Sequence, residues 1–162
     1  MFDRVFDAAM IGAGATALLD VWSAARAWAT GAPMPDYATV GRWIGSMARG
    51  RFVHEAIGKA AAVAGERAIG WSAHYVIGIA FAGMLLAAWP DWANAPTILP
   101  ALIVGIGSVA APFLLMQPGM GLGIAASRAP NPAAARLRSL TTHTVFALGL
   151  YASGWAVSAI KF

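Results

Sequence analysis

The sequence predicts an all-α integral membrane protein with four transmembrane helices, and three observations lead to this fold class. First, 59% of the 162 residues are hydrophobic, and 18 further residues are glycine. Second, only 11% are charged, whereas a soluble domain carries about 25% charged residues. Third, four separate segments are apolar enough to cross a bilayer. The composition therefore excludes a disordered chain, a disulfide scaffold, a coiled coil and almost any soluble enzyme.

A membrane-spanning helix needs about 20 mostly apolar residues, and each predicted span meets that length. The spans cover about residues 5–28, 68–89, 98–116 and 140–160, and together they form a single predicted domain over residues 1–162. The first span is the least apolar, because it contains Asp20 and Arg26. The third span is the most apolar, and it contains Pro112.

The connections between the spans differ sharply in charge. The basic residues of the first connection are Arg42, Arg49, Arg51, Lys59 and Arg67. Those of the third connection are Arg128, Arg136 and Arg138. The second connection, PDWANAPT, has no basic residue. In a four-span protein the first and third connections lie on one side of the membrane, and both termini lie on the other. Because basic connections stay in the cytoplasm, the sequence predicts that both termini lie outside. The net charge of +4 is attributed to this orientation and to anionic lipid head groups, not to nucleic-acid binding.

The long first connection is predicted to contain a short helix that lies in the lipid head-group region. Its apolar residues recur at helical spacing, and they are Val40, Trp43, Ile44 and Met47. Arg42 lies off this stripe, as expected for an amphipathic interfacial helix. The alternative interpretation is a solvated loop. A second short helical stretch is expected over residues 54–64.

Three ionisable residues inside the spans are predicted to form a ligand site. Ionisable side chains are costly in a bilayer, so each requires a reason. Asp20, His74 and His143 come from three different spans, at depths of about 12, 9 and 5 Å from the cytoplasmic ends by the helix rise. Gln117, at the cytoplasmic end of the third span, would complete a ring drawn from all four spans.

Two residues of the first connection, His54 and Glu66, are further candidates for ligand binding. Each candidate also has a structural interpretation. Asp20 can pair with a basic residue, His74 can hydrogen-bond a neighbouring helix, and His143 can contact water near the interface. His54 and Glu66 can belong to an ordinary solvated face. No catalytic residue is predicted.

Three classes of function remain open from the residues alone. Two imidazoles and a carboxylate suit a transition-metal ion, and an intramembrane Asp and His also suit a proton. The first hypothesis is therefore binding or transport of a metal ion, a proton or a small polar ligand, by a protein that forms a homo-oligomer. The second is an intramembrane enzyme or a haem protein with His74 and His143 as axial ligands. The third is an accessory subunit of a larger membrane complex.

Several strings of the chain resemble a bacterial family of small inner-membrane proteins that is catalogued only as a domain of unknown function. These strings are VGRWIGSMARGRFVHEAIGKA, GERAIGWSAHYVIGIAFA and VAAPFLLMQPGMGLGIAASRAPNPAAARLRSLTTH. The resemblance implies a four-span protein of the bacterial inner membrane. It implies no activity and transfers no functional residue.

Overall fold

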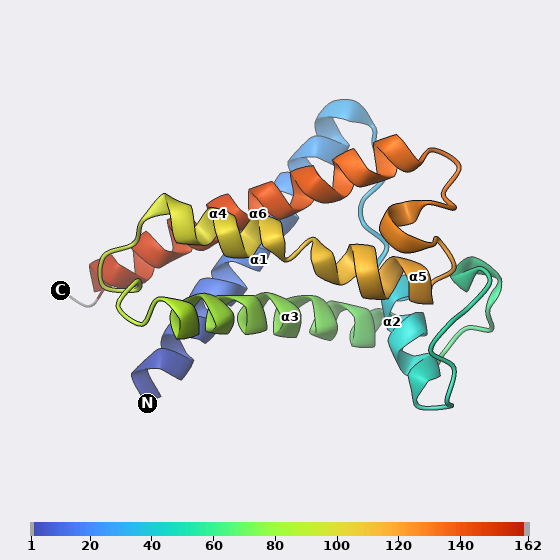
Figure 1. Cartoon of the computed structure of the whole chain (residues 1–162), viewed down its shortest axis with the longest axis horizontal. Helices are drawn as coiled ribbons and strands as arrows, with labels where there is room; N and C mark the ends of the chain where they lie inside the picture. Colours follow the sequence, from blue (N-terminus) through green and yellow to red (C-terminus); the bar gives the residue numbers. More distant parts are fainter. Residues whose placement is uncertain (1, 161–162) are drawn as a thin grey trace. The chain divides into compact units, whose positions relative to one another are not determined.

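The computed structural model describes residues 2–160, which form helices joined by short irregular segments, with no β-strand among them (Figure 1). Four helical segments are long and apolar enough to cross a membrane: Arg4–Thr30, Glu66–Ala88, Ile98–Gly119 and Pro132–Ile160. The first, second and fourth belong to helices α1 (Phe2–Thr30), α3 (Glu66–Ala88) and α6 (Pro132–Ile160). The predicted all-α fold class with four spans is confirmed.

The fourth helix begins earlier than the sequence suggested. The predicted span began at about residue 140, whereas α6 begins at Pro132. Proline suits the first turn of a helix, because its missing N–H would have no partner there. The Asn131 side chain accepts a hydrogen bond from the N–H of Ala134 at 3.1 Å and so caps this end. Arg136 and Arg138 consequently lie on the helix rather than in the connection.

The third span is not a uniform α-helix. It consists of α4 (Ile98–Gly107), a π-helical stretch η2 (Pro112–Met116) and the short α5 (Gln117–Gly119). Pro112 cannot donate a backbone hydrogen bond, so the regular ladder is interrupted at this position. The N–H of Gln117 donates to the carbonyl of Pro112, five residues earlier, which is the spacing of a π-helix.

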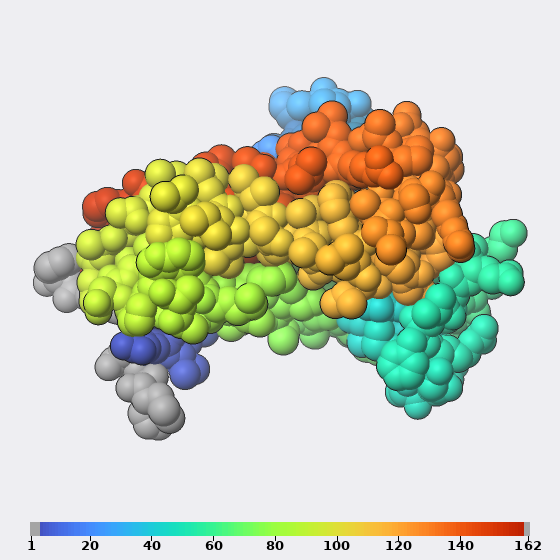
Figure 2. Space-filling view, viewed as in Figure 1, coloured from blue at the N-terminus to red at the C-terminus, as the bar shows by residue number. Residues whose placement is uncertain are grey.

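The helix predicted in the first connection is present as α2 (Tyr37–Met47). The Asp36 side chain accepts from the N–H of Ala38 at 3.0 Å and caps its N-terminus. The helix expected over residues 54–64 is wrong for most of its length, because only the 3₁₀ turn η1 (Ile57–Lys59) forms there. The backbone of this stretch bonds instead to the end of the third span, with the N–H of His54 donating to the Gly119 carbonyl at 2.8 Å. Figure 2 shows this turquoise stretch at the surface.

The chain divides into two compact units. The first unit consists of residues 1–34, 75–108 and 141–162, and the second of residues 35–74 and 109–140. The prediction of a single domain over the four spans stays a prediction.

Small residues allow close helix contacts in the first unit. A Cβ on Gly12 would overlap the backbone of Ile79, and a Cβ on Gly105 would overlap Ala147. Side chains that are fully buried, such as Ile11, fill the space around these contacts. The helices of this unit therefore pack with their backbones close together, as glycine in membrane helices favours.

Candidate functional site

His143 hydrogen-bonds the hydroxyl of Ser108 within the first unit. Its Nδ1 lies 2.7 Å from Ser108 Oγ, and that hydroxyl donates to the Gly105 carbonyl at 2.6 Å. A hydroxyl carries only one proton, so Nδ1–H of His143 donates to Ser108. In the neutral ring, Nε2 then carries a lone pair and no proton. The structural interpretation of His143 was contact with water near the interface; among the described residues, its ring is hydrogen-bonded to Ser108, at the end of α4.

Asp20 accepts a hydrogen bond from Tyr75, which belongs to the same unit. The Tyr75 hydroxyl donates to Asp20 Oδ2 at 3.0 Å, across the contact between α1 and α3. Both residues are partly buried. The carboxylate predicted to be part of a ligand site therefore has a phenol hydroxyl directly against it.

The helix register brings Asp20 and His143 to a similar height in the first unit. Where α1 meets α6, Gly14 faces Ser153 and Ala15 faces Gly149, so the two helices are antiparallel. Asp20 lies five residues beyond Ala15, and His143 lies six residues before Gly149. At a rise of about 1.5 Å per residue, Asp20 and His143 therefore lie within about 2 Å of the same position along the axes of the two helices.

His74 belongs to the second unit and lies in an aromatic cluster. Its Nε2 is hydrogen-bonded to the Tyr37 hydroxyl at 3.0 Å. The Tyr37 and His74 rings are stacked, with centroids 4.2 Å apart, and the Trp71 ring lies edge-on to His74 at 5.9 Å. The interhelical hydrogen bond expected of a structural His74 is thus present, with α2 supplying the partner.

Glu66 forms an ion pair with Arg42 rather than facing solvent freely. Arg42 Nε and Nη2 donate to the two carboxylate oxygens at 2.8 and 2.7 Å, in a bidentate arrangement. Glu66 Oε2 also accepts from the N–H of Val63 at 3.0 Å, just before α3 begins. The hydrogen bonds with Glu66 raise the pKa of the Arg42 guanidinium above its ordinary value.

Two buried polar atoms in the second unit lack a partner among residues 2–160. His54 and Gln117 are each only 6% exposed. His54 Nε2 and Gln117 Oε1 make no hydrogen bond within this range. The Gln117 amide nitrogen donates to Ser139 Oγ at 3.4 Å, which is a long hydrogen bond. A buried polar atom without a partner costs about 1–3 kcal/mol, so these atoms would gain from a polar ligand group.

The described residues contain no group of three or more His, Asp or Glu placed to hold a metal ion. Asp20 and His143 share the first unit, whereas His74, His54, Gln117 and Glu66 belong to the second. The shared site of all three span residues stays a prediction.

The sequence analysis missed the hydroxyl partners Tyr37, Tyr75 and Ser108. A signal existed for two of them, because Tyr75 and Ser108 are polar residues inside predicted spans. It also missed Asp7, a carboxylate that is only 4% exposed on α1. Asp7 lies near the N-terminal end of the first predicted span, and nothing in the sequence alone shows that the helix buries it.

Comparison with known proteins gives a family and no activity. Neither the curated proteins nor the solved structures gave a match. A family model matches residues 9–157, which is most of the chain, and it carries the description "Protein of unknown function (DUF2938)". The suspected membership of an uncharacterised family is confirmed, and the chain belongs to the DUF2938 family.

Proposed function

We propose that this membrane protein binds a proton or a small polar ligand at a site formed by Asp20, Tyr75, Ser108 and His143. One observation carries the proposal: Asp20 and His143 lie at a similar height on two antiparallel helices, and each is hydrogen-bonded to a hydroxyl group. The distances are 3.0 Å for Tyr75 to Asp20 and 2.7 Å for Ser108 to His143. Ionisable residues inside a membrane commonly serve a ligand or proton pathway.

The orientation of Ser108 gives His143 a defined chemical role in this proposal. Since Nδ1–H donates to Ser108, Nε2 is free to accept a proton or a hydrogen bond from a ligand. Asp20 would accept from the same ligand or exchange the proton. A transition-metal ion would need a third ligand, and the sequence-based proposal assigns that role to His74. His54 and Gln117 are proposed as secondary ligand residues, because each has a buried polar atom without a described partner.

The chain has three histidines, so ¹⁵N-histidine labelling gives few ring signals, which single His→Gln variants assign. A pH titration of the purified protein in nanodiscs would then follow each ring separately. Asp20→Asn should shift the titration midpoint of His143, because it removes a negative charge from the proposed site. Asp91→Asn, at an exposed aspartate in the connection before the third span, is the matched control. An unchanged midpoint of His143 in Asp20→Asn would end the shared-site proposal.

Element analysis and an absorption spectrum of the same sample separate the ligand classes. A stoichiometric transition metal that is lost in both Asp20→Asn and His143→Gln would support the metal version. A Soret band would favour the haem-protein alternative. If the sample contains no stoichiometric transition metal and shows no Soret band, proton uptake by reconstituted vesicles would distinguish a proton site from a site for a small polar solute.

We infer that the protein lies in the inner membrane of a bacterium with both termini outside. The charge pattern of the connections supports this orientation. We further propose that it forms a homo-oligomer or joins a larger membrane complex. Of the most apolar window of the third span, only 22% of the residues are buried, and an exposed Gly107 there leaves room for another helix. The mass of the particle in mild detergent, and any co-purifying chain, would test this assembly.

A further inference from the structure

The positive charge of the chain is concentrated in the second unit. Eight of the eleven Lys and Arg residues lie there, together with three of the seven acidic residues. The second unit therefore carries a net charge of +5, and the first unit carries −1. One of the eight, Arg42, is held by Glu66, so its charge is already paired.

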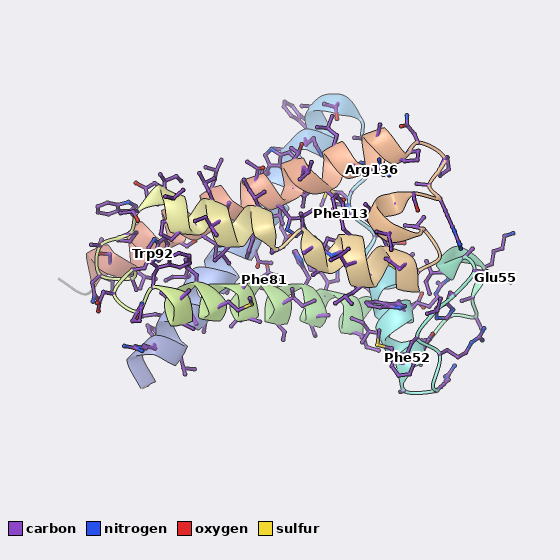
Figure 3. The ribbon with its side chains drawn as sticks, viewed as in Figure 1. Phe52, Glu55, Phe81, Trp92, Phe113 and Arg136 are labelled. Atoms are coloured by element: carbon purple, nitrogen blue, oxygen red, sulfur yellow. The ribbon has the colours of Figure 1, made fainter. Side chains whose placement is uncertain are left out.

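The loop after α2, residues 48–53, places two arginines beside two exposed apolar side chains. Arg49 and Arg51 are exposed, and their side chains make no hydrogen bond or ion pair with the described residues. Phe52 and Val53 follow directly and are 60% and 73% exposed (Figure 3 labels Phe52). Contiguous exposed apolar surface, rather than a single apolar side chain, marks a site of interaction with a membrane or a protein.

This loop is ordered by its own hydrogen bonds. The N–H groups of Arg49 and Arg51 both donate to the Ser46 carbonyl, at 3.0 and 3.1 Å. Gly50 has a φ of 74°, a conformation that glycine adopts without strain. The Trp43 indole donates to the Phe52 carbonyl at 2.9 Å and fixes the end of the loop. The apolar pair therefore projects from a fixed turn, so little conformational entropy is lost when the pair is buried.

We propose that residues 48–53 insert into the head-group region of an anionic membrane surface. Phe52 and Val53 would enter the boundary of the acyl chains, while Arg49 and Arg51 would contact the lipid phosphates. Stable attachment of this kind takes an apolar and a basic element together, and the loop supplies both. Charge complementarity favours anionic lipid over zwitterionic lipid, and each arginine near such a surface favours binding by about five-fold. The proposal concerns residues other than Asp20, Tyr75, Ser108 and His143 and does not depend on the proposed function.

The absence of cysteine from the chain makes a direct test practical. Val53→Cys carries a fluorescent probe in nanodiscs of phosphatidylcholine, with or without phosphatidylglycerol. Ala62→Cys, at an exposed position of the same connection, is the matched control. A nitroxide on the lipid head group should quench the probe at residue 53 strongly and the probe at residue 62 weakly. Aqueous iodide should give the opposite order.

Phosphatidylglycerol should increase the lipid quenching at residue 53, and added salt should reduce it. The variant with both Arg49→Gln and Arg51→Gln should lower the equilibrium constant for insertion by about 30-fold at low ionic strength and remove the effect of phosphatidylglycerol. Phe52→Cys serves as a second probe site if Val53→Cys is poorly folded. Equal iodide quenching at residues 53 and 62 would overturn the proposal in favour of a protein partner. Lipid quenching that does not respond to phosphatidylglycerol would overturn the role of the arginines.

Discussion

The hydroxyl of Tyr37 is hydrogen-bonded to Nε2 of His74 at 3.0 Å, and the two rings are stacked with centroids 4.2 Å apart. Tyr37 is the first residue of α2, and His74 lies on α3. An ionisable residue of a membrane span is thus tied to the helix of the preceding connection. The ring of His74 is therefore in direct contact with the first residue of α2.

Tyr37→Phe should remove the hydrogen bond while keeping the stacked ring. We expect a loss of about 0.5–1.5 kcal/mol in the free energy of unfolding, the usual net value of such a bond. Tyr37→Ala should cost more, because the ring contacts with His74 and Trp71 are lost as well. Thermal unfolding in detergent would measure both variants. In ¹⁵N spectra the ring signal of His74 should move in Tyr37→Phe and that of His54 should not; an unmoved His74 signal would contradict the assigned bond.

Gly41→Ala and Gly70→Ala should each destabilise the second unit strongly. A Cβ on Gly41 would overlap the Glu66 carbonyl, and a Cβ on Gly70 would overlap the Tyr37 carbonyl. Main-chain atoms cannot move aside as a flexible side chain can, so we expect a cost of about 3 kcal/mol, at the upper end for overpacking. Gly83→Ala is the helical control, since a Cβ there meets only the Ala8 side chain, at 4.0 Å. That control should be neutral or stabilising by up to about 1 kcal/mol, and similar melting temperatures for all three variants would refute the contact.

The pair of Arg42 and Glu66 should behave as one unit. Arg42→Gln and Glu66→Gln should each lower the melting temperature, because each leaves the partner unpaired. The double variant should lose less than the sum of the two single losses, as expected for residues in contact. Arg67→Gln, at an exposed neighbouring position, should have little effect. Additive losses in this cycle would mean that the two residues act separately.

The same pair has an expected pH dependence. Since the pKa of Arg42 is raised on folding, its contribution to stability is fully present below the unfolded-state pKa of arginine. It is lost only as the pH rises through the folded-state value, which lies above the ordinary value. Between neutral pH and about pH 10, the free energy of unfolding should therefore change with pH in the same way in Arg42→Gln as in the unaltered chain. The two curves should differ only by a constant amount. A difference that grows between neutral pH and that limit would contradict the assignment.

Gln117→Leu should leave the ligand-free protein as stable as before, or more stable by up to about 1 kcal/mol. It removes the buried Oε1 that has no partner among residues 2–160, and it sacrifices only the 3.4 Å bond to Ser139. Ser139→Ala, which deletes only that bond, is the control. If Gln117 instead binds a ligand that stays with the purified protein, Gln117→Leu should lower its melting temperature and Ser139→Ala should not.

The orientation of the chain is open to a simple reporter experiment. A fusion partner that is active only in the cytoplasm should work when inserted near Gly50 and fail when placed after Phe162. The reason is the concentration of basic residues in the first connection, in the third connection and in the first turns of α6. The reverse pattern would place both termini in the cytoplasm.

The fold class was predictable because hydropathy depends on composition over about 20 residues, which the sequence displays directly. The helix boundaries were less predictable: Pro132 begins α6 eight residues before the predicted span, because the first two turns, which contain Arg136 and Arg138, are helical but not hydrophobic enough to be counted in a span. The π-helical turn at Pro112–Met116 was not predicted either. Proline signals an interruption, but the hydrogen-bond pattern that replaces the ladder depends on packing.

The sequence predicted the ionisable residues of the candidate site but not the side chains that hydrogen-bond them. Asp20 and His143 were identifiable as ionisable residues inside apolar spans. Their hydroxyl partners, Tyr75 and Ser108, lie 55 and 35 residues away along the chain. Whether such residues meet depends on how each helix is rotated about its axis, and a single sequence with weak periodicity does not fix that rotation.

The crossing of α2 and α3 at Gly41 and Gly70 also limits how the chain can recover from damage. A suppressor mutation normally relieves a clash by shrinking the neighbour that a larger side chain strikes. Here a methyl group on Gly41 would strike the Glu66 carbonyl and the Gly70 amide nitrogen, which are atoms that almost every amino acid carries. No substitution at residue 66 or 70 can remove them and keep the helix. Genetic repair of an alanine at position 41 is therefore restricted to true reversion or to changes that move the whole of α2 away from α3.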